Sequence, residues 1–234
     1  MNIPGIGMRK LNAAHANGAG PLLLETVTQN YKVQVDRYVS VDFNSMIDII
    51  DKLGGVELTL SDDEVRVANN YITEMCNLRK LDPNSYYFIK GGTKTCSGIQ
   101  AVAYARIRYV GNADYQRTER QRTVIEAMIT KVQKSGVTTI NSVVDEVFDD
   151  ISTNITPKQM LSLGSHALSY KMVDNSGFPF ELKTKNMGKR GDCVIPLDLE
   201  TNVIELHEYL FGSDTYTPTD SVKEKSKQII NDTG

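Results

Sequence analysis

Apolar residues recur along this chain with two different periods, and the alternation between them indicates an α/β fold. Val56, Leu58 and Leu60 alternate with polar residues, as in a strand that covers a core with one face. Residues 43–53 before them read as a helix that a Gly-Gly pair stops. The other expected elements are helices at 21–31, 97–106, 124–132, 144–151 and 157–168, a buried strand at 38–41, and paired strands at 178–182 and 193–195.

Two capping signals place the starts of helices. Ser97 is followed three residues later by Gln100, the spacing at which the two side chains satisfy each other's free backbone N–H groups. Thr156 and Gln159 have the same spacing, with Pro157 at the first helical position, where its missing N–H costs nothing. Both sites predict a helix N-terminus.

Arginines gather in the stretch from Tyr104 to Arg122. It holds five arginines and two acidic residues, a balance of +3 in a chain of net charge −3, so the remaining residues sum to −6. The five are Arg106, Arg108, Arg117, Arg120 and Arg122. A basic cluster on an acidic chain requires a chemical explanation.

The helix after this cluster has an apolar stripe formed by Val124, Ile125, Met128, Ile129 and Val132. Steps of three and four residues backwards from the stripe reach Arg117, Arg120 and Gln121, which therefore lie on or beside its core-facing side. A helix N-terminus favours anions, and guanidinium groups bind phosphate. The cluster predicts a phosphorylated ligand, while the alternative is internal pairing with Asp114, Glu119 and distant acids.

Several motifs give the chain a resemblance to the LytR-CpsA-Psr family of bacterial surface phosphotransferases. The arginine stretch carries R-x-R followed by D-x-x-R-x-x-R-Q. Matching segments precede it at 10–20, 36–58 and 90–106 and follow it at 205–212, with Tyr216 and Pro218 beyond. The resemblance covers most of the chain and keeps the order of the family's motifs.

The resemblance implies an enzyme that transfers an anionic glycopolymer, teichoic acid or capsular polysaccharide, from a polyprenyl pyrophosphate carrier to peptidoglycan. It implies that Arg106 and Arg108 hold the pyrophosphate, and that Asp114, Arg117 and Gln121 complete the catalytic site. Arg120 is expected to bind substrate or to support the residues that do. Positive charge suits this reaction, since negative charge spreads over the transferring oxygens.

Arg106 and Arg108 impose a condition on the backbone. Residues two apart do not share a helix face, but they share one side of an extended segment. We therefore expect the helix from Ser97 to end near Arg106. Arg122 departs from the family pattern and receives no role. Asp114 is the only candidate for the general base.

The family places a membrane-spanning helix, a strand with a metal-binding aspartate and an arginine-aspartate motif ahead of the segment matched at 10–20. The chain starts a few residues before that point, so we expect a fragment or a truncated product that lacks its membrane anchor. Magnesium is the expected cofactor, with no ligand that can be named. Four acidic residues fit capping and solvated-face roles better than metal binding: Asp36, Asp42, Asp48 and Asp51.

The domain expectation follows from length and from the resemblance. With 234 residues and 40% hydrophobic content the chain is long enough for one well-packed domain. We expect a three-layer α-β-α domain with a central mixed sheet, formed by residues 1–218 and lacking its first strands. Residues 219–234 are expected to be a polar tail, either an exposed helix or a frayed end. The expected location is the extracellular face of the bacterial cell membrane or the cell wall.

Three questions stay open at this level. Cys76 and Cys96 are compatible with a disulfide and with two free thiols, and no zinc spacing occurs. The apolar stripe behind the arginines can simply fill the core. The family resemblance implies instead that it lines a tunnel for the polyprenyl chain. Two other functions are a non-catalytic module that binds polyprenyl pyrophosphate and a transcriptional attenuator that binds nucleic acid. The negative charge disfavours nucleic acid as a partner.

Overall fold

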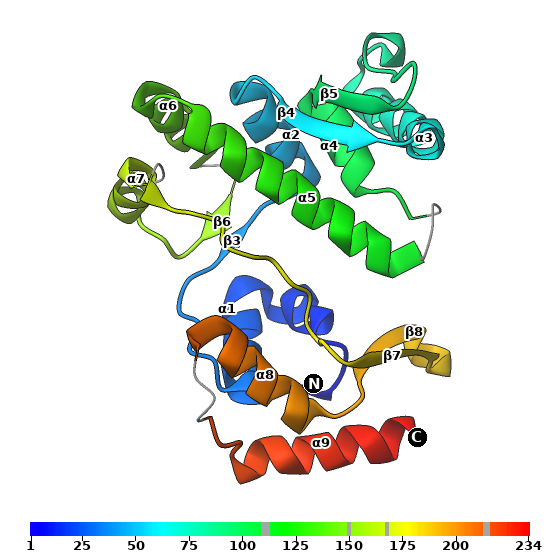
Figure 1. Ribbon diagram of the computed structural model, residues 1–234, viewed down its shortest axis with the longest axis vertical. Coiled ribbons are helices and arrows are strands. Elements are labelled where there is room, and N and C mark those ends of the chain that lie inside the picture. The colour runs from blue at the N-terminus through cyan, green and yellow to red at the C-terminus, as the bar shows by residue number, and fades with distance from the viewer. Residues whose placement is uncertain (109–112, 149–150, 167–168, 213–215) are drawn as a thin grey trace. The chain divides into compact units, whose positions relative to one another are not determined.

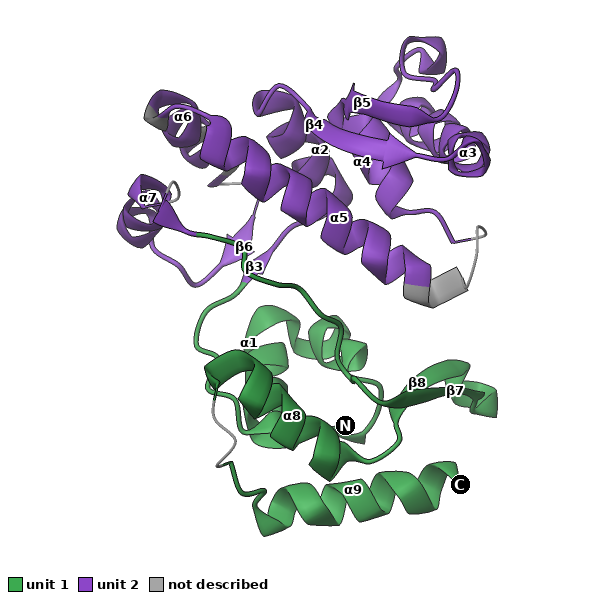
Figure 2. Ribbon diagram, viewed as in Figure 1, with its two compact units in different colours: residues 1–38, 171–234 green, residues 39–170 purple. Residues whose placement is uncertain are grey.

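The computed structural model describes residues 1–108, 113–148, 151–166, 169–212 and 216–234 (Figure 1). The chain forms two compact units: unit 1 comprises residues 1–38 and 171–234, and unit 2 comprises residues 39–170 (Figure 2). The mixed α/β class is confirmed, with helices predominating.

The central mixed sheet that we expected is not found in the described ranges. The strands there form four separate two-stranded antiparallel sheets. Of the eight strands within these ranges, four are only two residues long, too short to provide a buried face for covering helices.

Unit 2 builds its core from two longer strands and the helices packed around them. Its elements in chain order are β3 Val39–Ser40, α2 Phe43–Lys52, β4 Val56–Leu60, α3 Asp62–Arg79, η1 Pro83–Ser85, β5 Gly92–Cys96, α4 Gly98–Ala105, α5 Ala113–Lys134, α6 Val137–Val147, β6 Ser152–Thr153 and α7 Pro157–Ser165. Strand β4 pairs with β5, and α5 packs against β4 and α4. The core therefore lies between this strand pair and helices α2 to α5.

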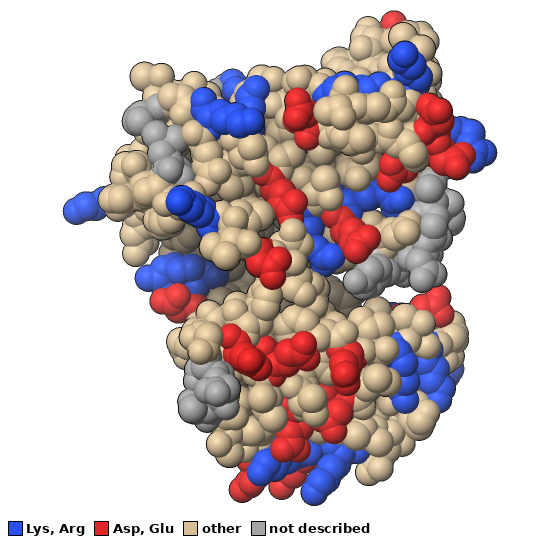
Figure 3. Space-filling view, viewed as in Figure 1, with Lys and Arg blue, Asp and Glu red and all other residues tan. Residues whose placement is uncertain are grey.

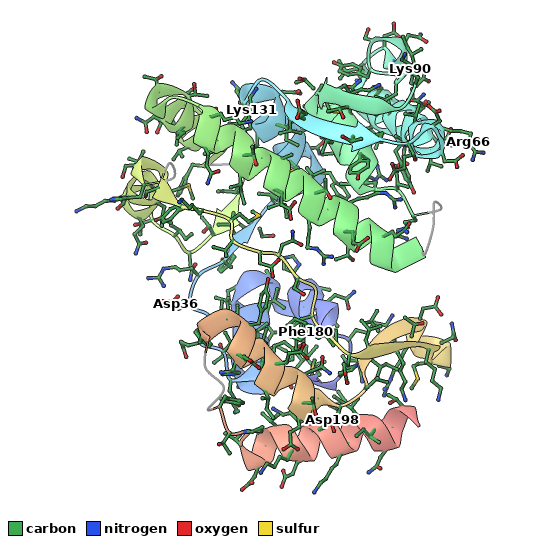
Figure 4. All side chains as sticks on the ribbon, viewed as in Figure 1. Asp36, Arg66, Lys90, Lys131, Phe180 and Asp198 are labelled. Atoms are coloured by element: carbon green, nitrogen blue, oxygen red, sulfur yellow. The ribbon has the colours of Figure 1, made fainter. Side chains whose placement is uncertain are left out.

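The expected strand with one covered face is confirmed in β4. Val56, Leu58 and Leu60 are buried, and the two residues between them are exposed. Helix α2 also ends where expected, because Gly54 and Gly55 adopt positive φ angles of 74° and 83°. The side chain of Lys131, labelled in Figure 4, donates to the carbonyl of Gly54 at 3.5 Å, which ties α5 to this turn.

Other expected elements of unit 2 need correction. The strand expected at 38–41 is only β3, and Val39 in it is 52% exposed, because its sole partner in the described part is the two-residue strand β6. The helix expected at 144–151 lies earlier, as α6, with Phe148 as its C-terminal cap. Helix α7 has the capping box of Thr156 and Gln159 and ends at Ser165.

Unit 1 joins both ends of the chain. Its elements are β1 Asn2–Ile3, β2 Gly7–Met8, α1 Asn12–Tyr31, β7 Leu182–Asn186, η4 Gly188–Arg190, β8 Asp192–Pro196, α8 Leu199–Phe211 and α9 Asp220–Thr233. The expected late strand pair exists as β7 and β8, although β7 starts at the residue where we expected the first strand to end. Helix α1 is interrupted at Gly18 and Ala19, so its second part begins near Pro21 as expected.

A buried amide organises the entry into the β7–β8 hairpin. The Oδ1 atom of Asn202 accepts the backbone N–H groups of Phe180 and Glu181 at 2.7 and 3.1 Å, and its Nδ2 donates to the carbonyl of Glu181 at 3.0 Å. Phe180 and Asp198, the N-cap of α8, are both labelled in Figure 4. Asn202 is fully buried, so it replaces water for a segment without regular structure.

The last residues of the chain form part of the core of unit 1. Helix α9 buries Val222, Ser226 and Ile229, and the hydroxyl of Ser226 accepts the N–H of Leu199 at 2.9 Å. We expected residues 219–234 to form an exposed helix or a frayed end, and only the polar face of α9 is exposed in this way. Apolar residues at helical spacing within 219–234 decide this, since they can be buried while the lysines stay in water.

Candidate functional site

Helix α4 delivers the first two candidate arginines, and its position is fixed at its start. Ser97 and Gln100 form the expected capping box, and the Asp51 carboxylate accepts the N–H of Gly98 at 2.7 Å. A Cβ atom on Gly98 would lie 2.1 Å from the carbonyl oxygen of Ile47, so only glycine permits this approach of α4 to α2. The helix ends at Ala105 with Arg106 as its C-terminal cap, as expected.

Arg106 is held by three side chains of unit 2. Its Nη2 donates to Oε1 of Glu74 at 2.9 Å. Its guanidinium carbon lies 4.9 Å from the ring centroid of Tyr71 and 5.4 Å from that of Phe43. The side chain keeps 21% of its surface exposed, so a ligand can still reach it.

Arg108 has a different environment. It is exposed, whereas Ile107 between the two arginines is fully buried and anchors the segment in the core. Among the described residues, Arg108 forms no ion pair. Its charge is available to an anion from solution.

Helix α5 contributes the other candidates. Arg117 and Gln121 are half-buried, and the Nε atom of Arg117 lies out of contact with solvent. The backbone of Asp114 belongs to α5, but its side chain lies outside the described residues. We expected Arg117, Arg120 and Gln121 on or beside the core-facing side, and the burial of all three agrees with this.

Arg120 is the most buried of the arginines, with 6% of the residue exposed. Its Nε donates to Oε1 of Glu64 at 2.8 Å, and its Nη1 donates to the carbonyl of Ile107 at 3.4 Å. The same carboxylate accepts the N–H of Ser61 through Oε2 at 2.8 Å and so closes the capping box of α3. Arg120 thus links α5 to the start of α3 and to the backbone between Arg106 and Arg108.

This link brings the two halves of the arginine stretch together. On α5, Arg117 lies one turn before Arg120 and Gln121 directly follows it, and the carbonyl that Arg120 contacts belongs to the residue between Arg106 and Arg108. That the side chains of these segments converge on one ligand stays a prediction. Sequence reasoning did not identify Glu64, Glu74, Tyr71 or Phe43, because they are distant in sequence from the arginines, and the capping-box spacing of Glu64 from Ser61 gives no sign of a pairing with Arg120.

Tyr104 lies beside this link on α4. Burial raises the pKa of its hydroxyl above the ordinary value, and the negative charge of Glu64 raises it further, while Arg120 acts in the opposite direction. Tyr104 is 7% exposed. It remains a neutral phenol at neutral pH, so it adds no negative charge near the arginines.

Three of the four aspartates that we did not assign as metal ligands have structural roles. Asp42 caps α2 by accepting the N–H of Ser45 at 2.8 Å, and this hydrogen bond lowers the pKa of its carboxyl. Asp48 pairs with Arg79 at 2.7 Å, and Asp51 holds Gly98. The described part of the chain contains no group of three or more His, Cys, Asp or Glu side chains that could hold a metal ion.

Cys76 and Cys96 are free and buried thiols. Burial raises the pKa of Cys96 to about 11 and also raises that of Cys76. The thiol form that predominates at neutral pH is a poor nucleophile and metal ligand. Both residues belong to the hydrophobic core of unit 2, so their role is packing.

Charges of both signs mix on the visible face of unit 2, and acidic side chains gather over α8 of unit 1 (Figure 3). Helix α8 carries Glu200, Glu205 and Glu208.

No described helix combines the length and hydropathy needed to cross a bilayer.

Known proteins are similar to this chain in sequence and in fold. The chain is 30% identical over 185 residues to polyisoprenyl-teichoic acid–peptidoglycan teichoic acid transferase TagT of Bacillus subtilis, an alignment that covers 77% of this chain and 54% of TagT. It therefore spans about half the length of this curated relative.

Two solved structures show the same fold. A protein of Enterococcus faecalis described as a transcriptional regulator has a TM-score of 0.72 at 22% identity, over 98% of this chain and 79% of its own. TagT bound to LIIa-WTA has a TM-score of 0.61 at 24% identity, over 99% and 74%. The model of the LytR_cpsA_psr family matches residues 1–201, and the chain belongs to that family.

Proposed function

We propose that this chain is the catalytic region of a phosphotransferase that moves an anionic glycopolymer from a polyprenyl pyrophosphate carrier to peptidoglycan. Teichoic acid is the polymer class that the name of TagT supports, and capsular polysaccharide remains the alternative. The observation that carries the proposal is the contact of Arg120 with the carbonyl of Ile107, which ties α5, the helix of Arg117 and Gln121, to the backbone between Arg106 and Arg108.

The reaction needs little covalent chemistry from the protein. A hydroxyl oxygen of the acceptor attacks the phosphorus atom that bears the glycopolymer, and the bond from that phosphorus to the bridging oxygen breaks. A phosphodiester forms, polyprenyl phosphate leaves, and the hydroxyl proton passes to a base. Guanidinium groups stabilise the charge that spreads over the phosphate oxygens. Asp114 remains the candidate for the base.

The four arginines with expected roles divide by exposure. Arg108, which is exposed, and Arg106, which keeps part of its guanidinium accessible, suit direct contact with the pyrophosphate. Arg120 suits a supporting role, because its guanidinium is already engaged by Glu64 and by the backbone that carries the other two. Arg117 and Gln121 complete the head-group site from α5.

A hydrophobic flank accompanies the site. Val124 is buried in the core and Met128 packs against it, whereas Ile125 and Ile129 are 48% and 37% exposed. The apolar stripe of α5 is thus only partly used by the core. Its exposed members can contact the first isoprene units of the carrier, with the remaining chain in a lipid tunnel.

Magnesium suits a pyrophosphate, because the ion offsets the negative charge of the phosphates while one or two carboxylates of a protein hold the ion. The described residues offer no carboxylate cluster for it, so no step is assigned to it. The proposal places the complete protein, with a central mixed sheet in a three-layer domain, on the extracellular face of the bacterial membrane. Such a protein requires a membrane anchor outside the described helices.

Transfer of a glycopolymer by variants of the full-length protein tests this function. Arg108→Ala and Arg117→Ala should reduce transfer at least a hundredfold, because each removes a charged contact to the phosphates, while thermal unfolding stays near that of the wild type. Arg66→Ala is the matched control, since that arginine is 76% exposed and pairs only with Asp63 among the described residues. Normal transfer by the first two variants would contradict the proposal.

Two further measurements separate the alternatives. Retained binding of polyprenyl pyrophosphate without transfer by the full-length protein identifies a non-catalytic module. Binding of DNA or RNA that weakens steeply with salt identifies an attenuator, because such contacts release counterions from the nucleic acid.

A further inference from the structure

Arg106 is surrounded by three residues that no motif singles out. Phe43 is the first residue of α2, and Tyr71 and Glu74 lie on α3. Residues three apart on a helix are neighbours on its surface, so α3 presents a ring and a carboxylate together. Helices α2 and α3 both pack against α4, which brings all three side chains to the end of α4.

The contacts restrain the guanidinium without using up its donors. Both ring centroids lie within the ~6 Å at which a cation is attracted to an aromatic face. Glu74 accepts one N–H from Nη2. Within the described part of the chain, Nε and Nη1 donate to no protein acceptor, so these N–H groups remain for an anion.

The cluster lies at the surface. Phe43 is 51% exposed, and the side chain of Glu74 is 52% exposed. A large aromatic residue with half of its surface in water contributes little to the core. Its position is therefore better explained by the cation that it contacts than by packing.

A free arginine side chain loses rotamer freedom when it is fixed. If neighbouring side chains fix it before the ligand arrives, that cost is absent from the binding step. The geometry points to Phe43, Tyr71 and Glu74 as positioning residues, which hold the Arg106 guanidinium with its free N–H groups available to a pyrophosphate. This inference rests on the proposed function and adds residues to the same site.

A double-mutant cycle tests the inference by measuring binding of geranylgeranyl pyrophosphate to the chain in micelles. Phe43→Leu should weaken binding two- to fivefold, the effect of losing one cation–π contact at a partly exposed site. Phe43→Tyr keeps a ring and should bind within twofold of the wild type. In an Arg106→Ala background, Phe43→Leu should have no further effect, because Phe43 acts through the arginine.

The same cycle separates two kinds of failure. If Arg106→Ala binds like the wild type, or if the wild type does not bind, the proposed function fails at this residue. If Arg106→Ala weakens binding while Phe43→Leu does not, only the positioning role is wrong. An equal effect of Phe43→Leu in both backgrounds also overturns the role, since it then acts independently of Arg106.

A measurement without ligand provides a second test. The NMR order parameter of the Arg106 Nε–H bond should fall in Phe43→Leu and in Tyr71→Leu, and should stay unchanged in Tyr71→Phe. Thermal unfolding of each variant shows that it remains folded. An order parameter that is already low in the wild type would contradict the inference.

Discussion

Two arginines of the same stretch pair with two glutamates of the same helix, and their surroundings separate them. Arg120 and Glu64, at the start of α3, are 7% and 15% exposed as side chains, and the pair is further engaged by backbone groups. Arg106 and Glu74, later on α3, are 21% and 52% exposed, and the arginine keeps N–H groups for a ligand. The Arg120–Glu64 pair therefore holds the site together, whereas Arg106 of the other pair can bind a ligand.

The physical reason for this division is desolvation. A charge taken out of water must be paired throughout the life of the fold, since an unpaired buried charge is strongly destabilising. A pair that stays in contact with water contributes little to stability, and it can exchange partners at low cost. Chemical identity and formal charge are the same in both cases.

The largest expected effect that separates the pairs is on stability. Arg120→Ala should lower the free energy of unfolding by about 3 kcal/mol, because it leaves the mostly buried Glu64 carboxylate without its cation. Urea unfolding of this variant beside Arg66→Ala, which should change the free energy by less than about 0.5 kcal/mol, measures the contrast.

A double variant sharpens that contrast. Glu64→Gln with Arg120→Met removes both charges and keeps a side chain able to close the capping box of α3. It should recover more than half of the loss caused by Arg120→Ala, because a buried pair is often replaced by uncharged groups at small cost. A double variant as unstable as Arg120→Ala would show that the pair itself, not the unpaired charge, dominates.

A smaller effect concerns the cap that presents Phe43 to Arg106. Asp42→Ala should cost about 1 kcal/mol at pH 7, the usual contribution of an N-cap. The hydrogen bond from Ser45 lowers the pKa of Asp42 below its ordinary value of 3.8. Its charge-dependent contribution is thus fully present above pH ~4 and is lost as the pH falls through the lowered pKa.

The matched variant for this cap is Asp42→Asn, which caps without titrating. Urea unfolding at pH 7 and at pH 3 should show a wild-type advantage over Asp42→Asn that shrinks at the lower pH. An advantage that grows at pH 3 would contradict the sign of the linkage.

The smallest effect tests whether Glu74 limits the charge of Arg106. Glu74→Gln keeps an acceptor for Nη2 and removes the negative charge, so geranylgeranyl pyrophosphate should bind about two- to fivefold more tightly. Glu57→Gln, an exposed glutamate on β4, serves as the control. Isothermal titration calorimetry at two salt concentrations measures both, and weaker binding by Glu74→Gln would show that its charge assists the site.

Local chemistry made part of the fold predictable. Ser97 with Gln100, Thr156 with Gln159, and the glycine pair after α2 act within a few residues of the boundaries that they set, so their effects follow from the sequence. The strand expected at 38–41 was wrong because its apolar residues have no long strand to pair with in the described part of the chain. Pairing is a property of two segments.

The candidate site divides in the same way. The end of α4 at Arg106 agrees with an argument made from residue spacing alone. The partners of the arginines lie far away in the sequence: Glu64 is 56 residues before Arg120, and Glu74 is 32 residues before Arg106. No periodicity connects such positions.

The sequence by itself determined the family, the helix boundaries set by caps and glycines, and the concentration of positive charge in one short stretch. Only the tertiary structure decided which arginine is buried and which remains open to a ligand. The physical reason is that the state of a charged side chain depends on the water and the carboxylates around it, and packing between distant segments sets both.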